Sequence, residues 1–328
     1  MIVVDADTLG RHRTGDETYV RELLRALPRD LELAAVTRRP DLVPDGVRAI
    51  ELQSRVQELR MLWSLPRLLR QLQPALAHFV HAIPPRLPCP AVLTVQDLSF
   101  ERDPTVMGAR ERAIFKAVVP WSARRAVHVF AISERTRADL VELYRIPEEK
   151  VTVTPLAPAP EFRPADDDGH DDYLLFVSSV EPRKDPLAAL AAARAVGMPL
   201  VVVGPHKDPA LVRAMREGGA DVRGYVPEDE LVRLYQRAAC LVHPTLYEGF
   251  ALTCAEAMAC GTPVVARPDA AVRELVGEAG ILTDDLAGGV ARALADRGRL
   301  RAAGLERARL YTWDETARRT AEVYRRLA

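Results

Sequence analysis

The sequence predicts an α/β protein with two domains, each built around a parallel β-sheet. Short apolar runs alternate along the chain with segments whose apolar residues recur at helical spacing, as expected of repeated strand and helix units. The 328 residues are long for one hydrophobic core and sufficient for two. A stretch rich in proline and acidic residues at 155–172 separates two sets of such units, so we expect a domain boundary near residue 160.

The first set begins with an apolar run at 2–6. A helix is predicted next, because apolar residues recur at i, i+3, i+4 and i+7 from Val20, and Pro28 ends it. The remaining apolar runs of strand length in this set lie at 31–36, 47–52, 75–80, 91–95 and 127–132. The first domain is therefore predicted to span residues 1–160.

The second set is predicted to form the domain at 161–312. Its expected strands lie at 173–178, 200–204, 221–224, 239–243 and 263–266. In α/β sheets, ligands bind beyond the carboxyl ends of the strands. Two such domains facing each other would form a cleft lined by loops from both.

Two glutamates, Glu248 and Glu256, follow the expected strand at 239–243. The segment is typical of a glycine-bearing loop at 247–250 and a helix at 251–260 that Gly261 ends. A loop that ends at a helix N-terminus presents free N–H groups and the positive end of the helix dipole, which favour a phosphate. Eight helical residues cover about 12 Å, whereas the paired carboxylates of retaining glycosidases lie about 5 Å apart. The two glutamates are therefore expected to contact different parts of one ligand.

This arrangement predicts a nucleotide sugar as that ligand, with phosphates at the helix start. One glutamate would contact the sugar hydroxyls and the other the ribose diol. The alternative is that Glu248 is an ordinary turn residue and Glu256 a solvated helix residue.

Two cations, Arg183 and Lys184, follow the expected strand at 173–178. They precede Pro186, a favourable first residue for a helix at 187–196. Cations at this position can neutralise a diphosphate, and each charge-assisted hydrogen bond contributes about 1.5 to 3 kcal/mol. A solvated turn is the alternative.

The loop after the first strand has glycines at Gly10 and Gly15, the spacing of a nucleotide-binding P-loop. Asp16 and Glu17 follow instead of lysine and serine or threonine, so a P-loop site is excluded. No Gly-x-Gly-x-x-Gly follows a strand either, which argues against a dinucleotide dehydrogenase. Gly15 either shapes the entry to the helix or lets backbone amides approach a ligand.

Composition limits the class of protein. Lys and Arg number 45 against 46 Asp and Glu, and this balance does not favour nucleic acid as the main partner. The four cysteines form no Cys-x-x-Cys pair, and the sequence opens on a strand with no signal-type segment, so we expect a reduced, cytoplasmic protein. The seven histidines have no spacing typical of a metal site, and we expect no metal and most histidines to be structural.

The stretch 55–70 mixes leucines and Trp63 with arginines. It is expected to be a helix that packs on its own sheet. Peripheral contact with a membrane, and through it with a lipid acceptor, is the alternative.

Several segments, in order, resemble the retaining glycosyltransferases of family 4. They are Val-Gln-Asp-Leu-Ser-Phe at 95–100, Phe-Val-Ser-Ser-Val-Glu-Pro-Arg-Lys at 176–184, Val-Gly-Pro at 203–205, Gly-Tyr-Val-Pro-Glu-Asp-Glu-Leu at 224–231, Glu-Ala-Met-Ala-Cys-Gly-Thr-Pro-Val-Val at 256–265 and Tyr-Thr-Trp at 311–313. The Glu-x7-Glu motif of the family corresponds to Glu248 and Glu256. The resemblance covers nearly the whole chain, and its specificity comes from the number and order of the segments.

The resemblance implies the GT-B fold, with two Rossmann-like domains facing each other across a cleft. The first would be the acceptor-side domain, with the C-terminal helix at 313–328 packing back on it, and the second would bind the nucleotide sugar. The implied reaction is transfer of a hexosyl group, mannosyl or glucosyl, to a hydroxyl of a small-molecule, glycan or lipid-linked acceptor with retention. The donor would be a GDP or UDP sugar, without a metal or other cofactor.

The resemblance also implies roles for single residues. Lys184 and Arg183 would stabilise the departing diphosphate, Glu248 would contact the sugar hydroxyls and Glu256 the ribose. The other donor-binding positions implied are Gly15, Gln96, Gly204, Tyr225, Val226, Gly249, Phe250, Ala251 and Leu252.

Three positions depart from the family pattern. Gln96 replaces a common histidine and cannot titrate, Ser179 replaces an arginine, and Ala251 replaces a glycine, for which we expect only a small change of loop shape. These departures leave two alternatives to a transferase: a nucleotide-sugar epimerase of the same fold and a catalytically silent nucleotide-sugar-binding subunit.

Overall fold

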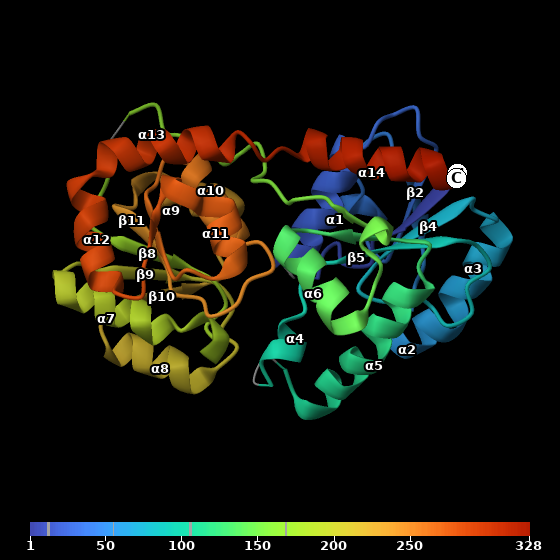
Figure 1. Cartoon of the computed structure of the whole chain (residues 1–328), viewed down its shortest axis with the longest axis horizontal. Helices are drawn as coiled ribbons and strands as arrows, with labels where there is room; N and C mark the ends of the chain where they lie inside the picture. Colours follow the sequence, from blue (N-terminus) through green and yellow to red (C-terminus); the bar gives the residue numbers. More distant parts are fainter. Residues whose placement is uncertain (12–13, 55, 105–106, 168) are drawn as a thin grey trace. The chain divides into compact units, whose positions relative to one another are not determined.

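The computed structural model describes residues 1–11, 14–54, 56–104, 107–167 and 169–328. The chain divides into two compact units, each with its own parallel sheet (Figure 1). The first unit comprises Met1–Arg102, Met107–Leu156 and Trp313–Ala328. The second comprises Ala157–Thr312 and a short stretch that begins at Asp103.

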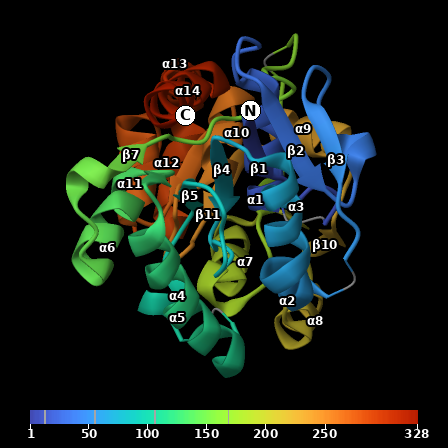
Figure 2. The ribbon, with the colours of Figure 1, turned by 90° about the vertical axis from the view of Figure 1, so that its right-hand side faces the viewer.

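The first unit contains a seven-stranded sheet in the order β3-β2-β1-β4-β5-β6-β7, parallel throughout. Figure 2 shows β3 towards one edge and β7 towards the other. The strands are β1 (Ile2–Asp5), β2 (Leu33–Thr37), β3 (Arg48–Glu51), β4 (Leu76–Val80), β5 (Ala91–Val95), β6 (His128–Ala131) and β7 (Val151–Val153). This is a doubly wound order, whose switch point lies between β1 and β4.

Helices cover both faces of this sheet. One face carries α1 (Thr14–Ala26) and the C-terminal helix α14 (Trp313–Leu327), which contact each other. His78 of β4 joins the two layers, since its ring nitrogens lie 2.5 Å from the Tyr324 hydroxyl and 2.7 Å from the Thr94 hydroxyl. The other helical segments of this unit are α2 (Gln57–Leu59), η2 (Arg60–Ser64, π-helical), α3 (Leu65–Leu72), α4 (Ser99–Arg102), α5 (Ala109–Arg125), α6 (Glu134–Tyr144), η1 (Pro40–Leu42) and η3 (Glu148–Lys150).

The second unit repeats the plan with a six-stranded sheet in the order β10-β9-β8-β11-β12-β13. Its strands are β8 (Leu174–Val177), β9 (Leu200–Val203), β10 (Asp221–Gly224), β11 (Cys240–His243), β12 (Val264–Ala266) and β13 (Ile281–Leu282). Its helical segments are η4 (Pro182–Lys184), α7 (Pro186–Val196), α8 (Pro209–Glu217), α9 (Glu228–Arg237), α10 (Leu252–Ala259), α11 (Ala270–Val276), η5 (Gly277–Ala279), α12 (Leu286–Ala295) and α13 (Arg297–Ala308). In Figure 1, α7, α8 and α12 lie on one side of this sheet and α9, α10, α11 and α13 on the other. The switch point here lies between β8 and β11.

The strands expected from the apolar runs are all present, within two residues at either end. Two strands were not expected, β7 and β13. Both lie at a sheet edge and are only three and two residues long, too short to show an apolar pattern. The helix after the first strand buries the apolar face that its spacing predicts, since Val20, Leu23, Leu24 and Leu27 are at most 1% exposed.

Candidate functional site

The predicted site residues of the second unit gather at the carboxyl ends of β8 and β11. These two strands are neighbours in the sheet, with Leu175 opposite Leu241. The chain that leaves β8 forms η4, which contains Arg183 and Lys184, and the chain that leaves β11 forms the loop with Glu248. Because carboxyl ends of adjacent parallel strands lie at one edge, residues far apart in the sequence become neighbours.

Lys184 and Glu248 form a buried ion pair. The Lys184 ammonium lies 2.5 Å from Oε1 of Glu248, and the two residues are both about 8% exposed. Burial raises the pKa of Glu248, but the nearby Lys184, His243 and Arg183 lower it more, so this pKa lies well below its usual range. Burial also lowers the pKa of Lys184, against the charge of Glu248. Glu248 is therefore a buried and ion-paired residue of the loop between β11 and α10.

Arg183 of η4 forms hydrogen bonds with the backbone of the loop that contains Glu248. Its Nη1 donates to the Tyr247 carbonyl at 2.7 Å and its Nη2 to Glu181 at 3.1 Å, while its own carbonyl accepts from the Leu246 N–H at 3.0 Å. Arg183 is 9% exposed, so the solvated-turn interpretation does not hold. The guanidinium thus orders the backbone immediately before Glu248.

The helix α10 begins without a side-chain cap. Asp185, Asp208, Asp269 and Asp285 cap α7, α8, α11 and α12, whereas α10 has Ala251 at its N-cap and no acidic residue in its first turn. The backbone N–H groups of Ala251, Leu252 and Thr253 make no hydrogen bond within the described part of the chain. They remain available to an anion.

Ala251 has left-handed backbone dihedrals, with φ 70° and ψ 50°. Only glycine adopts these without steric cost, which explains why a glycine is common here in the resembling family. Gly249 and Phe250 precede it, and Phe250 is buried with its ring edge-on to Tyr311, 5.6 Å away between ring centroids. The loop turns into α10 at Ala251.

Glu256 has an environment opposite to that of Glu248. It lies one turn into α10, is 8% exposed and accepts a 2.8 Å hydrogen bond from the Tyr235 hydroxyl of α9. Burial raises its pKa to about 8, the bond from Tyr235 lowers it, and the charge of Glu228 raises it further. The interpretation of Glu256 as a solvated helix residue is wrong.

Gly204, Tyr225 and Val226 follow the neighbouring strands β9 and β10. A Cβ at Gly204, where φ is 139°, would lie 2.1 Å from the Ser178 carbonyl oxygen, so only glycine fits there. Its N–H donates to the Gly224 carbonyl at 2.8 Å, which joins the ends of β9 and β10. Tyr225 is 62% exposed, whereas Val226 is buried. An exposed ring at this edge is suited to contact a planar group.

The predicted site residues of the first unit, Gly15 and Gln96, lie beside each other. A Cβ at Gly15 would be 3.4 Å from Oε1 of Gln96. Gln96 is 7% exposed, and its Nε2 is buried without a hydrogen-bond partner among the described residues. Residues 12 and 13 of the glycine loop lie outside the described residues.

The sequence did not reveal a charged cluster at the end of β1. Arg60, fully buried, contacts Asp5 at 2.5 Å and Asp7 at 3.6 Å, and Arg38 lies 2.9 Å from Asp7. Arg11 also pairs with Asp7. The two aspartates at the end of the first strand were the part of this cluster that the sequence could have indicated. Their arginine partners come from distant segments, so the pairing could not be read from the sequence.

The stretch at 56–70 packs on its sheet as expected, since Leu65 and Leu69 are fully buried in the core of the first unit, while residue 55 lies outside the described residues. Leu59, Leu62 and Trp63, however, are 53%, 46% and 64% exposed. In the part of the chain that the structure describes, no helix has both the length and the apolar character needed to cross a membrane. Nor do the described residues include a group of three His, Cys, Asp or Glu that could hold a metal ion.

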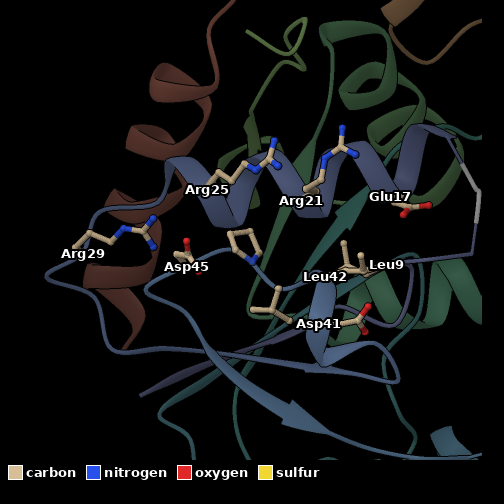
Figure 3. A pocket seen from close by; sticks show the side chains of 10 residues that line it. Leu9, Glu17, Arg21, Arg25, Arg29, Asp41, Leu42 and Asp45 are labelled. Atoms are coloured by element: carbon tan, nitrogen blue, oxygen red, sulfur yellow. The ribbon is translucent and has the colours of Figure 1, made fainter. Parts of the chain in front are cut away.

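A groove of about 560 Å³ lies on the first unit along α1, and none of the predicted site residues lines it (Figure 3). Its charged lining residues are Glu17, Arg21, Arg25, Arg29, Asp41 and Asp45. These charges balance, and Arg21 and Arg25 already donate to the buried Glu22 at 2.7 and 2.9 Å. The groove therefore has no charge excess that would favour an ionic ligand.

Two family models match the chain. The family described as Glycosyl transferases group 1 matches residues 171–296, and Glycosyltransferase Family 4 matches residues 13–157. The O-antigen chain mannosyltransferase B of Escherichia coli is 28% identical over 72% of this chain and 70% of that protein. The chain spans about half the length of the D-inositol 3-phosphate glycosyltransferases that it also matches.

Solved structures share the fold over the full chain. The sucrose-phosphate synthase of Thermosynechococcus elongatus has a TM-score of 0.81 at 20% identity, covering 99% of this chain and 98% of that one. Anabaena HepE in complex with UDP-glucose has a TM-score of 0.76 at 16% identity, covering 100% of both chains. At these identities the likeness concerns the fold.

Proposed function

Since the chain belongs to glycosyltransferase family 4 and has the GT-B fold, we propose that it transfers a mannosyl or glucosyl group from a GDP or UDP sugar to an acceptor hydroxyl, with retention. One observation carries this proposal. Lys184 of η4 pairs with Glu248 of the loop that leads to the uncapped start of α10, so a cation, a carboxylate and free N–H groups occur together. A cation and N–H groups can bind a diphosphate, and a carboxylate can accept from sugar hydroxyls.

In this proposal the second unit is the donor-binding domain. The N–H groups of residues 249–252 and the charges of Lys184 and Arg183 bind the diphosphate, and Oε2 of Glu248 accepts from sugar hydroxyls. Glu256 binds the ribose diol, and Tyr225 and Val226 contact the base. The first unit is the acceptor-side domain, where Gly15 and Gln96 contribute backbone and amide donors.

The proposed reaction requires no metal and no covalent intermediate with the protein. The bond between the anomeric carbon and the diphosphate breaks, and the acceptor oxygen forms its bond to that carbon on the same face. The acceptor proton passes to an oxygen of the departing diphosphate. Lys184 and the N–H groups at the start of α10 stabilise the negative charge that develops on this group.

Purified protein incubated with GDP-mannose, UDP-glucose and other nucleotide sugars tests the proposal. We expect nucleoside diphosphate release that depends on an acceptor hydroxyl, and a product whose anomeric configuration matches the donor. Glu248→Ala should abolish release while thermal unfolding stays cooperative. Release that continues unchanged in this variant would remove Glu248 from the mechanism.

The two alternatives differ in the same assay. An epimerase would convert the nucleotide sugar without an acceptor. A silent subunit would bind the nucleotide without turnover, and the unpartnered amide of Gln96, where a titratable histidine is common, is the observation that favours it. Acceptor-dependent release excludes both.

We also infer that the protein is cytoplasmic and contacts an anionic membrane peripherally. The four cysteines are free, which suits a reducing compartment. The exposed Leu59, Leu62 and Trp63 follow the exposed Glu58 and lie in the segment 59–70, which also carries the exposed Arg67 and Arg70, and Arg86 stacks on Trp63 at 5.8 Å from the ring centroid. Apolar side chains flanked by arginines match the interface of anionic lipids.

Flotation with vesicles of anionic or zwitterionic lipid tests this inference. The protein should float with the anionic vesicles only, and Trp63→Ser should weaken the binding. Leu310→Ser, which removes an equally exposed side chain from the second unit, is the matched control. Equal flotation of both variants and the wild type would contradict the inference.

A further inference from the structure

His243 is a polar residue in a position that the fold makes apolar. It is the last residue of β11, after Cys240, Leu241 and Val242, and it is 2% exposed. Its Nδ1 lies 3.4 Å from the Thr253 hydroxyl in the first turn of α10, and its Nε2 lies 3.1 Å from Oε1 of Glu248. A buried imidazole is costly unless its nitrogens have partners, so these two contacts need an explanation.

The contacts of Glu248 are divided unequally between its two oxygens. Oε1 is approached by both Lys184, at 2.5 Å, and His243, at 3.1 Å. Oε2 makes no hydrogen bond to the described residues, so it is the oxygen left for a ligand. The orientation of the carboxylate, and therefore the direction of Oε2, depends on what holds Oε1.

The contact between His243 and Glu248 is close but not aligned. Nε2 is within hydrogen-bond distance of Oε1, yet it is buried without a partner in hydrogen-bond geometry among the described residues. Hydrogen bonds at catalytic sites are often poorly aligned without ligand and tighten when it binds. A small rotation of the ring or of the carboxylate would align this one.

We propose that His243 is a positioning residue that holds Oε1 of Glu248 and thereby directs Oε2 at the sugar hydroxyls of the donor. The hydroxyl of Thr253 donates to Nδ1, which leaves the hydrogen on Nε2, facing Glu248. The same imidazole thus connects the start of α10, the proposed diphosphate site, with the carboxylate proposed to bind the sugar. This role rests on the proposed function of Glu248.

Several charged or titratable groups besides His243 lie near Glu248 and are coupled to its pKa. Lys184 and Arg183 of η4 lower its pKa, and the Cys254 thiol of α10 lies close enough for the carboxylate to raise the pKa of that thiol. Removing His243 takes away one hydrogen-bond donor and leaves these groups in place. The pKa of Glu248 should therefore move upward without reaching its unperturbed value.

Two substitutions separate positioning from packing. His243→Phe keeps an aromatic ring and removes both nitrogens, whereas His243→Gln places an amide donor near the position of Nε2 without a titratable group. His128→Phe is the matched control, because His128 is also a buried strand histidine, 4% exposed, whose Nε2 lies 2.8 Å from the Thr152 hydroxyl and whose Nδ1 lies 3.4 Å from Nη2 of Arg326.

The first measurement is binding, which needs no acceptor. Calorimetry compares the affinity for GDP-mannose with that for GDP, and the affinity for UDP-glucose with that for UDP. The ratio of the two affinities is the gain in affinity from the sugar, or sugar gain. We expect His243→Phe to reduce this gain about tenfold and leave the affinity for the nucleoside diphosphate within about twofold, since one hydrogen bond to a charged group is affected. His243→Gln should restore most of the gain, and His128→Phe should not change it.

The second measurement is the pH profile of kcat/KM. In His243→Phe the acidic limb should move to higher pH, because Glu248 loses a donor, and in His243→Gln it should stay near the wild-type position. An unchanged sugar gain and pH profile in His243→Phe would overturn the proposal. Equal loss of sugar and nucleoside diphosphate binding, not restored by glutamine, would also overturn it, because His243 would then only support the fold.

Glu248→Gln, measured in parallel, separates failure of this inference from failure of the proposed function. If Glu248→Gln binds and turns over the donor like the wild type, the role of Glu248 is wrong and that of His243 falls with it. If Glu248→Gln loses the sugar gain while His243→Phe keeps it, only the inference on His243 is wrong.

Discussion

Glu256 should make the stability of this protein fall as the pH rises through neutrality. Burial raises its pKa to about 8 in the folded chain, against an ordinary value of 4.5. The folded state therefore keeps a proton that the unfolded chain releases. This contribution to stability is fully present below about pH 4.5, and it is lost progressively up to about pH 8 at roughly 1.4 kcal/mol per pH unit.

The substitution that reveals this is Glu256→Gln, which keeps the size of the side chain and an oxygen that can accept from the Tyr235 hydroxyl. The variant has no proton to lose. The free energy of unfolding of the variant minus that of the wild type should therefore increase by about 3 kcal/mol between pH 5 and pH 7.5. Urea unfolding followed by circular dichroism at several pH values measures the difference. His78 and His128, whose pKa values burial lowers to about 3 and about 4, titrate in both proteins and cancel.

The control and the contradicting result come from the same plots of unfolding free energy against pH. Glu217→Gln removes a carboxylate from an exposed position of α8, and its difference from the wild type should not grow with pH. If the curves of Glu256→Gln and the wild type run parallel from pH 5 to pH 7.5, Glu256 is already ionised in the fold and the reasoning from burial is wrong.

Ligand binding gives an independent test of the same group. If the ribose hydroxyls donate to the carboxylate, affinity for the nucleoside diphosphate should rise with pH until about pH 8, because the ionised form becomes available. Glu256→Gln should remove that part of the pH dependence. Calorimetry in buffers of different ionisation enthalpy would detect the proton released by the wild type on binding.

Three further substitutions test other parts of the structure. Arg60→Met should destabilise the fold by about 3 to 5 kcal/mol in urea unfolding, because it leaves the Asp5 carboxylate without its buried partner, and a loss below about 1 kcal/mol would contradict this. Ala251→Gly should stabilise the protein by about 1 kcal/mol, because it relieves a left-handed backbone, and no gain in the unfolding midpoint would show that the backbone is not strained. Lys184→Met should abolish diphosphate binding and cost stability, and adding Glu248→Gln should recover the stability but not the binding, as a double-mutant cycle by calorimetry and unfolding would show.

The sequence predicted the parts of the fold that rest on local pattern. The run at 200–203 is buried along its whole length, as expected of a parallel strand inside a sheet. Its unbroken series of apolar residues was enough to predict it. The strand at 281–282 was missed because two residues carry no pattern. The positions of Lys184 and Glu248 followed from strand ends, since the loops of neighbouring parallel strands lie at one edge.

Pairing and burial of charged side chains could not be predicted in the same way. Arg60 lies among exposed leucines and arginines in the sequence. Only the three-dimensional structure shows that its side chain is buried and paired with Asp5, 55 residues earlier. Glu256 depends on Tyr235, which comes from the preceding helix, 21 residues away. His243 lay inside an expected strand, and that setting favoured a structural interpretation because its contact with Glu248 depends on the course of the loop.

Glu248 and Glu256 show why one loop and helix can hold two carboxylates beside a diphosphate. A free carboxylate next to a bound anion would repel it. Here Lys184 compensates Glu248 at 2.5 Å, and Glu256 keeps its proton at neutral pH because burial raises its pKa more than the bond from Tyr235 lowers it. The pair therefore adds little net negative charge in the absence of ligand, and the free N–H groups at the start of α10 keep their attraction for phosphate. Two glutamates of opposite pKa shift are thus compatible with an anion site in a way that two solvated glutamates would not be.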